Sequence, residues 1–133
     1  MPGMRACVRC ASTGTNGLIF RQLFEAESST YTYLLADRES KEAILIDPVL
    51  ETVKRDAQLV EDLGLTLKYG LNTHLHADHI TGTGQLKELL PEMLSAISAE
   101  SGADADRQLV EGDRIHFGRR SITAIATPGH TDG

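Results

Sequence analysis

The short apolar segment at residues 43–46 constrains the fold more than any other part of the sequence. Its four residues show no polar alternation, which is the pattern of a strand buried on both faces, with a layer packed on each side. Apolar residues then recur at helical spacing between Val53 and Leu63, ahead of Gly64, and a further strand is predicted at 65–72. A strand, a helix and another strand in this order favour a mixed α/β layer structure.

The rest of the chain predicts strands on either side of this unit. Apolar and polar residues alternate in several short runs that are separated by turn residues, which favours strands joined as hairpins. A short helix with Leu86, Leu89 and Leu90 is predicted before Pro91. The other predicted strands are residues 19–24 and 31–35, which form an antiparallel meander with 43–46, and residues 93–98, 107–110, 114–117 and 121–126.

Length and composition predict one domain preceded by a different kind of segment. The 133 residues suit a single globular unit. Residues 1–24 contain three Arg and no Asp or Glu, the composition of a leader or of a disordered N-terminus. We therefore expect residues 1–17 to be such a segment and residues 18–133 to form the domain.

The charge of the chain bears on its partners. The net charge is −6 and the pI about 5.3, whereas surfaces that bind nucleic acids or anionic membranes need clustered Lys and Arg. No apolar stretch approaches the roughly 18–20 residues that a membrane span requires. We expect neither a nucleic acid nor a membrane as a partner.

Four side chains that can bind metals follow directly after the predicted strand at 65–72. His74, His76, Asp78 and His79 fall within six positions. In an extended segment residues i and i+2 point to the same side, so His74 and His76 can reach one metal. Asp78 and His79 follow where the backbone turns and can reach a neighbouring position. Imidazole and carboxylate suit zinc, iron or manganese, and the lack of a nearby thiolate favours an open site that keeps water or substrate as a ligand.

Three further residues follow the ends of predicted strands and are candidates for the same site. His130 follows the predicted strand at 121–126 in a Pro-Gly turn, and we expect it to be a metal ligand beside the cluster. Thr131 can hydrogen-bond nearby backbone. Asp47 ends the buried strand, where its ordinary role is to cap the following helix or to accept from turn amides, here close to the site.

Three motifs together resemble the metallo-β-lactamase superfamily: residues 44–48, then 74–79, then 128–131, in that family's order. Within it, residues 24–25, 33–40, 45–52 and 55–59 are similar to the mitochondrial persulfide dioxygenases. The resemblance runs from about residue 18 to residue 133. It implies an αββα metallo-β-lactamase sandwich, truncated to roughly its first half.

The resemblance also implies a mononuclear non-haem Fe(2+), one per chain, that oxidises glutathione persulfide with O₂ to sulfite and glutathione in sulfide catabolism. His74 and His130 would be the catalytic iron ligands, and the adjacent metal-site motif would be His76, Asp78 and His79. Asp47 and Thr131 would support these ligands. The family's downstream Asp ligand and the basic residues that grip glutathione have no counterpart, and Asp132 stands where the family usually has Pro. The implied location is the mitochondrial matrix, with the cytoplasm as the alternative, and a homodimer stays open.

Two alternative functions stay open from the sequence. The first is a Zn2+-dependent glutathione thioester hydrolase, similar to hydroxyacylglutathione hydrolases, in which metal-bound hydroxide attacks the thioester carbonyl. One zinc would then be held by His74, His76 and His130, and a second by Asp78 and His79. The second alternative is a non-catalytic truncated fragment that binds metal or pairs with another chain.

Overall fold

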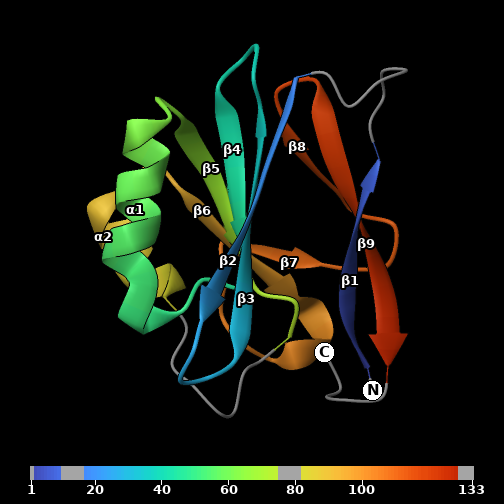
Figure 1. The fold of residues 1–133 in the computed structure, drawn as a ribbon. Coiled ribbons are helices and arrows are strands. Elements are labelled where there is room, and N and C mark those ends of the chain that lie inside the picture. Colours follow the sequence, from blue (N-terminus) through green and yellow to red (C-terminus); the bar gives the residue numbers. More distant parts are fainter. Residues whose placement is uncertain (1, 10–16, 75–81, 129–133) are drawn as a thin grey trace.

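The computed structural model describes residues 2–9, 17–74 and 82–128, and in this part of the chain two sheets pack face to face (Figure 1). The larger sheet has the strand order β2-β3-β4-β5-β6-β7, with bounds Leu18–Glu25, Thr30–Asp37, Glu42–Ile46, Thr66–Leu71, Leu94–Ser98 and Arg107–Leu109. The smaller sheet has the order β1-β9-β8, with bounds Pro2–Arg9, Arg120–Pro128 and Arg114–Phe117. Helices α1 (Val53–Asp62) and α2 (Thr83–Leu89) cover the outer face of the larger sheet.

Strand β4 is buried on both faces, as its sequence predicts. Ala43 and Leu45 belong to the apolar cluster beneath α1 and α2. Ile44 and Ile46 belong to the second cluster, between the two sheets, together with Phe117 of β8. Helices, larger sheet and smaller sheet form three successive layers of an αββα sandwich, so the predicted fold class is confirmed for the described residues.

The direction of the strands decides where the site lies. β2, β3 and β4 form the predicted antiparallel meander. β4, β5 and β6 are parallel neighbours, so their carboxyl ends meet at one edge of the sheet. In open α/β sheets this edge is the usual place for a binding site.

Residues 2–9 form β1, inside the segment for which we expect a leader or a disordered N-terminus. β1 pairs antiparallel with β9, with Pro2 opposite Pro128 and Arg9 opposite Ser121. The sequence contains a signal for this strand, because the apolar residues Met4, Ala6 and Val8 occupy alternate positions. A leader role for residues 1–17 stays a prediction.

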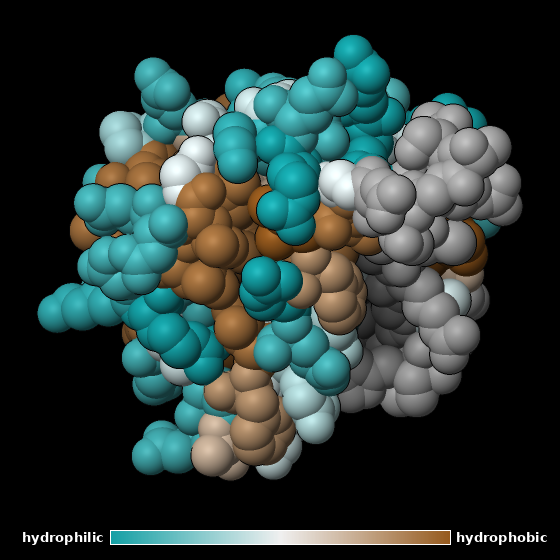
Figure 2. Space-filling view, turned by 45° about the horizontal axis from the view of Figure 1, so that its top comes forward, coloured by the Kyte–Doolittle hydropathy of each residue, from teal (hydrophilic) through white to brown (hydrophobic). Residues whose placement is uncertain are grey.

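Helix α2 is confirmed for Leu86 and Leu89 but ends at Leu89, so that Leu90 is its C-cap residue. Leu86 is fully buried, but Leu89 is 52% exposed. Leu89 lies at the rim of a shallow cavity at the end of the sheet where β5 and β6 begin, which is lined by Leu65, Thr66, Leu67, Leu89, Leu90, Pro91, Glu92 and Met93. Figure 2, which turns the top of Figure 1 forward, shows hydrophobic residues gathered between hydrophilic ones on this side of the molecule.

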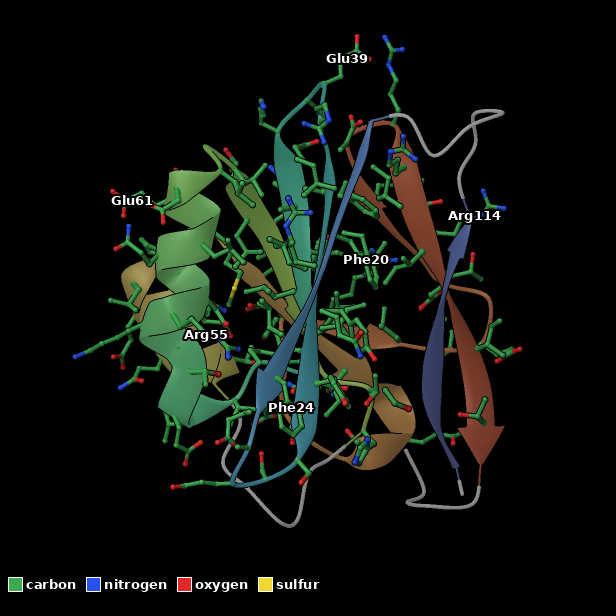
Figure 3. All side chains as sticks on the ribbon, viewed as in Figure 1. Phe20, Phe24, Glu39, Arg55, Glu61 and Arg114 are labelled. Carbon is green, nitrogen blue, oxygen red and sulfur yellow. The ribbon has the colours of Figure 1, made fainter. Side chains whose placement is uncertain are left out.

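A buried ion pair joins the two sheets beside the turn between β3 and β4, where Glu39 is labelled in Figure 3. Asp37 and Arg120 are 4% and 5% exposed, and their Oδ1 and Nε atoms lie 3.6 Å apart. The Gly118 amide donates to Glu42 Oε2 at 2.8 Å. Gly118 has φ 64°, and a Cβ there would collide with the carboxylate of Asp37. This end of the sandwich therefore requires both the ion pair and the glycine.

The acid sensitivity of the fold should depend on Asp37. Burial alone would raise its pKa, but hydrogen bonds from Ser40 and from the amides of Arg119, Ser40 and Glu39 outweigh burial and lower the pKa below 3.8. The stability that Asp37 contributes is therefore present above its unfolded pKa and is lost as the pH falls through the folded pKa. We expect Asp37→Asn to reduce the free energy of unfolding by about 3 kcal/mol at neutral pH. The free energy of unfolding should also fall less steeply in this variant as the pH is lowered. Urea unfolding at neutral pH and at about pH 3 measures both effects.

The matched control is Glu39→Gln, which removes an exposed carboxylate whose Oε2 lies 3.4 Å from Arg119 Nη1. An exposed pair contributes about 0–1 kcal/mol, so this variant should unfold almost as the parent does. Equal losses in the two variants would contradict a special role for the buried pair.

Candidate metal centre

The site is built where β4 and β5 end side by side. The Asp47 amide donates to the Leu71 carbonyl at 2.7 Å, which extends the β4–β5 pairing by one residue. Asp47 has φ 55°, a left-handed conformation that short polar residues tolerate better than others. Its carbonyl accepts a hydrogen bond of 2.8 Å from the hydroxyl of the fully buried Thr32. The backbone of Asp47 is thus held from β3 and from β5.

Both carboxylate oxygens of Asp47 are directed to a single residue of the β5 end. Oδ1 accepts from the Thr73 amide and Oδ2 from the Thr73 hydroxyl, each at 2.8 Å. The helix-capping role is not observed, because the N-cap residues of the 3₁₀ turn Leu50–Thr52 and of α1 are Val49 and Thr52, without side-chain cap bonds. Asp47 instead fixes the residue that precedes His74.

His74 is half-buried and follows this anchored threonine. Its Nδ1 lies 3.0 Å from Thr73 Oγ1. His74 also borders a cavity of about 230 Å³ between the end of β6, the start of α2 and the loop before β7. The lining residues are Asn72, His74, Thr83, Gly84, Lys87, Ser95, Ala96, Ile97, Ala103, Asp104 and Ala105.

Hydrogen bonds to Asp106 hold the loop at residues 103–105, which lines this cavity. Lys87 of α2 donates to Asp106 Oδ2, which also accepts from the amide and the hydroxyl of Ser95 at 2.9 and 3.1 Å. The Asp106 amide donates back to Ser95 Oγ at 3.0 Å. Elsewhere in the lining, Asn72 Nδ2 donates to Thr83 Oγ1 at 3.1 Å. The cavity therefore has a fixed polar rim.

The structure places only part of the predicted site. His74 and Asp47 are brought together through Thr73, whereas His76, Asp78, His79, His130 and Thr131 lie outside the described residues. Among residues 17–74 and 82–128, no three His, Cys, Asp or Glu side chains are grouped so that they could hold a metal ion. The assignment of His74, His76, Asp78, His79 and His130 to a metal site therefore stays a prediction.

Thr73 is the site residue that the sequence did not single out. A threonine is an uncommon metal ligand and belongs to no metal motif, so the composition of the cluster gives no signal for it. The only signal is its position between a predicted strand and His74. Its role becomes visible only once β4 and β5 are known to be parallel neighbours.

Comparison with known proteins identifies what the chain is similar to. The family described as the metallo-beta-lactamase superfamily matches residues 26–133. The mitochondrial persulfide dioxygenase ETHE1 of Mus musculus is 62% identical over 116 residues, which are 87% of this chain and 46% of that protein. The hydroxyacylglutathione hydrolase of Rhodospirillum rubrum is 37% identical over 109 residues, 80% of this chain and 41% of that protein. The chain thus spans about half the length of the curated relatives it matches.

Solved structures give the same picture of the fold. ETHE1 from Myxococcus xanthus superimposes with a TM-score of 0.82 at 49% identity, covering 86% of this chain and 50% of that one. A metallo-beta-lactamase from Staphylococcus aureus gives a TM-score of 0.78 at 25% identity, covering 90% of this chain and 37% of that one.

The polar rim of the cavity can be tested through the titration of Asp106. The hydrogen bond from Lys87 is the largest of the effects that lower the pKa of Asp106 to about 2. Lys87→Met should therefore raise this pKa toward its ordinary value of 3.8. Carboxyl carbon chemical shifts followed by NMR during acid titration measure the change. The control is Lys68→Met, which should leave the Asp106 pKa unchanged, since Lys68 pairs instead with Glu42 at 3.6 Å. An unchanged Asp106 pKa in Lys87→Met would rule out the contact between Lys87 and Asp106.

Proposed function

Because the chain belongs to the metallo-beta-lactamase superfamily, we propose that it carries part of the iron centre of a persulfide dioxygenase that uses glutathione persulfide and O₂. Its 60–62% identity to three mitochondrial persulfide dioxygenases supports this function over the hydrolases, which are 31–37% identical. The proposed setting is sulfide catabolism in the mitochondrial matrix, with the cytoplasm as the alternative location.

The observation that carries the proposal is the anchored position of His74 at the end of β5. Its Nδ1 contacts the Thr73 hydroxyl, so the other ring nitrogen, Nε2, is the atom suited to a metal. Neutral imidazole held by an outer hydrogen bond is a common donor for Fe(2+) and for Zn2+. The donor chemistry of the described part of the site therefore fits a metal ion.

We assign the roles of the remaining site residues on the same basis. His74 and His130 would hold one Fe(2+), and His76, Asp78 and His79 would surround it. Asp47 orients the β5 end, and Thr131 would do the same after β9. A bound Fe(2+) would supply the activation of O₂ toward the persulfide sulfur. The usual donor set for this chemistry is two His and one carboxylate with open positions, of which this chain would supply the two His.

The cavity beside His74 would receive the part of glutathione that lies away from the sulfur. Its walls combine apolar Ala96 and Ile97 with the charged side chains of Lys87 and Asp104. Glutathione carries carboxylates and an ammonium group, so both signs of charge at the rim are complementary to it. This cavity is the described space closest to the proposed ligand His74.

We propose no nucleic-acid or membrane partner, in keeping with the acidic composition. Within the described residues, neither helix is long and apolar enough to cross a membrane. A homodimer is compatible with the exposed edge strand β2, which can pair with a second copy. Size-exclusion chromatography with light scattering would distinguish a dimer from a monomer.

Metal analysis combined with substrate turnover tests the proposed function directly. We expect the purified chain to bind about one iron per chain, as the single pair of proposed ligands implies, and His74→Ala to lose this iron. The control is His116→Ala, because His116 is an exposed residue of β8. Metal content is measured by elemental analysis, and turnover by O₂ uptake on glutathione persulfide.

The same experiment separates the alternatives. Bound zinc with cleavage of a glutathione thioester would support the hydrolase, to which the 31–37% identical relatives belong. Metal binding without turnover of either substrate would support a non-catalytic fragment. Retention of iron in His74→Ala would overturn the ligand assignment.

The cavity assignment has a test of its own. Titration of the ¹⁵N-labelled chain with glutathione should shift the amide signals of Ala103 and Ala105, which line the cavity beside His74. The amides of Leu67 and Leu90, which line the other cavity, should not move. Lys87→Met should weaken the response because it removes a cation of the cavity lining together with the contact to Asp106 that holds the adjacent loop. Shifts confined to the second cavity would contradict the assignment.

A further inference from the structure

The Thr73 hydroxyl lies between a carboxylate and an imidazole, and it has only one proton. Oγ1 lies 2.8 Å from Asp47 Oδ2 and 3.0 Å from His74 Nδ1. A hydroxyl can donate one hydrogen bond and accept others, whereas an ionised carboxylate only accepts. The direction of one hydrogen bond therefore determines the direction of the other.

The second oxygen of Asp47 indicates which direction holds. Oδ1 accepts from the Thr73 amide at 2.8 Å, so both oxygens act as acceptors toward one residue, as in an ionised carboxylate. The Thr73 hydroxyl must then donate its proton to Oδ2. His74 Nδ1 faces the lone pairs of Oγ1 and can contact it favourably only by carrying a proton itself.

We infer that Asp47, acting through the hydroxyl of Thr73, sets the Nδ1–H tautomer of His74 and so keeps Nε2 free of a proton for the metal. Asp47 and Thr73 are thus positioning residues that act on a ring proton, beyond holding the loop in place. The inference rests on the proposed function only in treating His74 as a metal ligand. The tautomer itself is a property of the metal-free chain.

The surroundings of Asp47 make this arrangement rigid. Its amide and carbonyl are bound by Leu71 and Thr32, so the carboxylate has little freedom to turn away. The two bonds to Thr73 close a ring between side chain and backbone. A neutral histidine without such a partner would exchange its proton between both nitrogens, and the metal would have to select one form.

Replacing Asp47 with Asn should reverse the direction of the two hydrogen bonds made by Thr73 Oγ1. In Asp47→Asn the amide oxygen still accepts from the Thr73 backbone N–H, which leaves the NH₂ group facing Thr73 Oγ1 as a donor. The hydroxyl proton then turns toward His74 Nδ1, and the ring proton moves to Nε2, where it blocks the metal. A carboxylate-to-amide change beside a histidine can impose the wrong tautomer with little change in geometry.

Thr73 offers a matched pair of variants. Thr73→Ser keeps the hydroxyl, whereas Thr73→Val keeps the shape of the side chain and removes the hydroxyl. Val also loses the hydrogen bond to Asp47 Oδ2, so a merely structural tie would lower metal affinity in Val without changing the tautomer of His74. If the hydroxyl sets the tautomer, Ser should keep the Nδ1–H pattern of the parent chain, whereas Val should lose it and show a mixture of both tautomers.

Long-range ¹⁵N–¹H correlation spectra of the metal-free chain, labelled at His and recorded under mildly alkaline conditions, report the tautomer directly. The His74 signals are assigned by their loss in His74→Gln. We expect the Nδ1–H pattern in the parent chain and in Thr73→Ser, and the Nε2–H pattern in Asp47→Asn. Titration with Zn(II) against a chelator should show about 10–100-fold weaker binding in Asp47→Asn and Thr73→Val, and nearly parental binding in Thr73→Ser.

The outcomes separate this inference from the proposed function. An Nε2–H pattern in the parent chain, or the same tautomer in the parent and in Asp47→Asn, would overturn the inference. If Asp47→Asn does not fold, as judged by its amide spectrum, the parent spectrum and the Ser and Val pair still decide. The expected tautomers without any metal binding would sustain the inference and overturn the proposed metal site.

Discussion

The parallel pairing of β4 with β5 is the constraint on which the rest of the site depends. Ile46 is in register with Leu71, so Asp47 and Thr73 emerge at the same edge of the sheet. A slip of one residue would turn every side chain of β5 to the opposite face. Thr73 would then face away from Asp47, and Leu71 would leave the apolar cluster between the sheets. The burial of these two strands thus fixes the positions of polar atoms that are themselves only half-buried.

The two ends of the larger sheet serve different purposes. Near the β3–β4 turn, Asp37 and Arg120 are buried and join the two sheets. At the opposite end, Asp47 adopts a left-handed backbone conformation and directs both carboxylate oxygens to Thr73. The apolar clusters on both faces of the sheet lie between these ends. Substitutions at the site can therefore change its protonation while the core that defines the fold stays intact.

The sequence predicts the parts of the structure that depend on local pattern. The apolar run of β4, the helical spacing of α1 and the strands β2 and β3 are each predicted from the sequence, and the structure confirms them. β1 was not predicted, although Met4, Ala6 and Val8 alternate, because its basic residues resemble a leader. Thr73 was missed for a different reason. Its contact with Asp47 spans 26 positions and depends on strand register, which no local pattern contains.

A metal at the proposed site would act on stability as well as on chemistry. His74 follows β5 of the larger sheet, and His130 comes shortly after β9 of the smaller sheet. Figure 1 shows β9 running toward the same end as β4, away from the β3–β4 turn. A metal held by both histidines would therefore join the sheets at the end opposite the Asp37–Arg120 pair. A ligand that binds only the folded chain stabilises it by mass action. The hydrogen bonds from Asp47 through Thr73 to His74 present Nε2 to the metal, so their effect on metal affinity would raise the free energy of unfolding only when metal is bound.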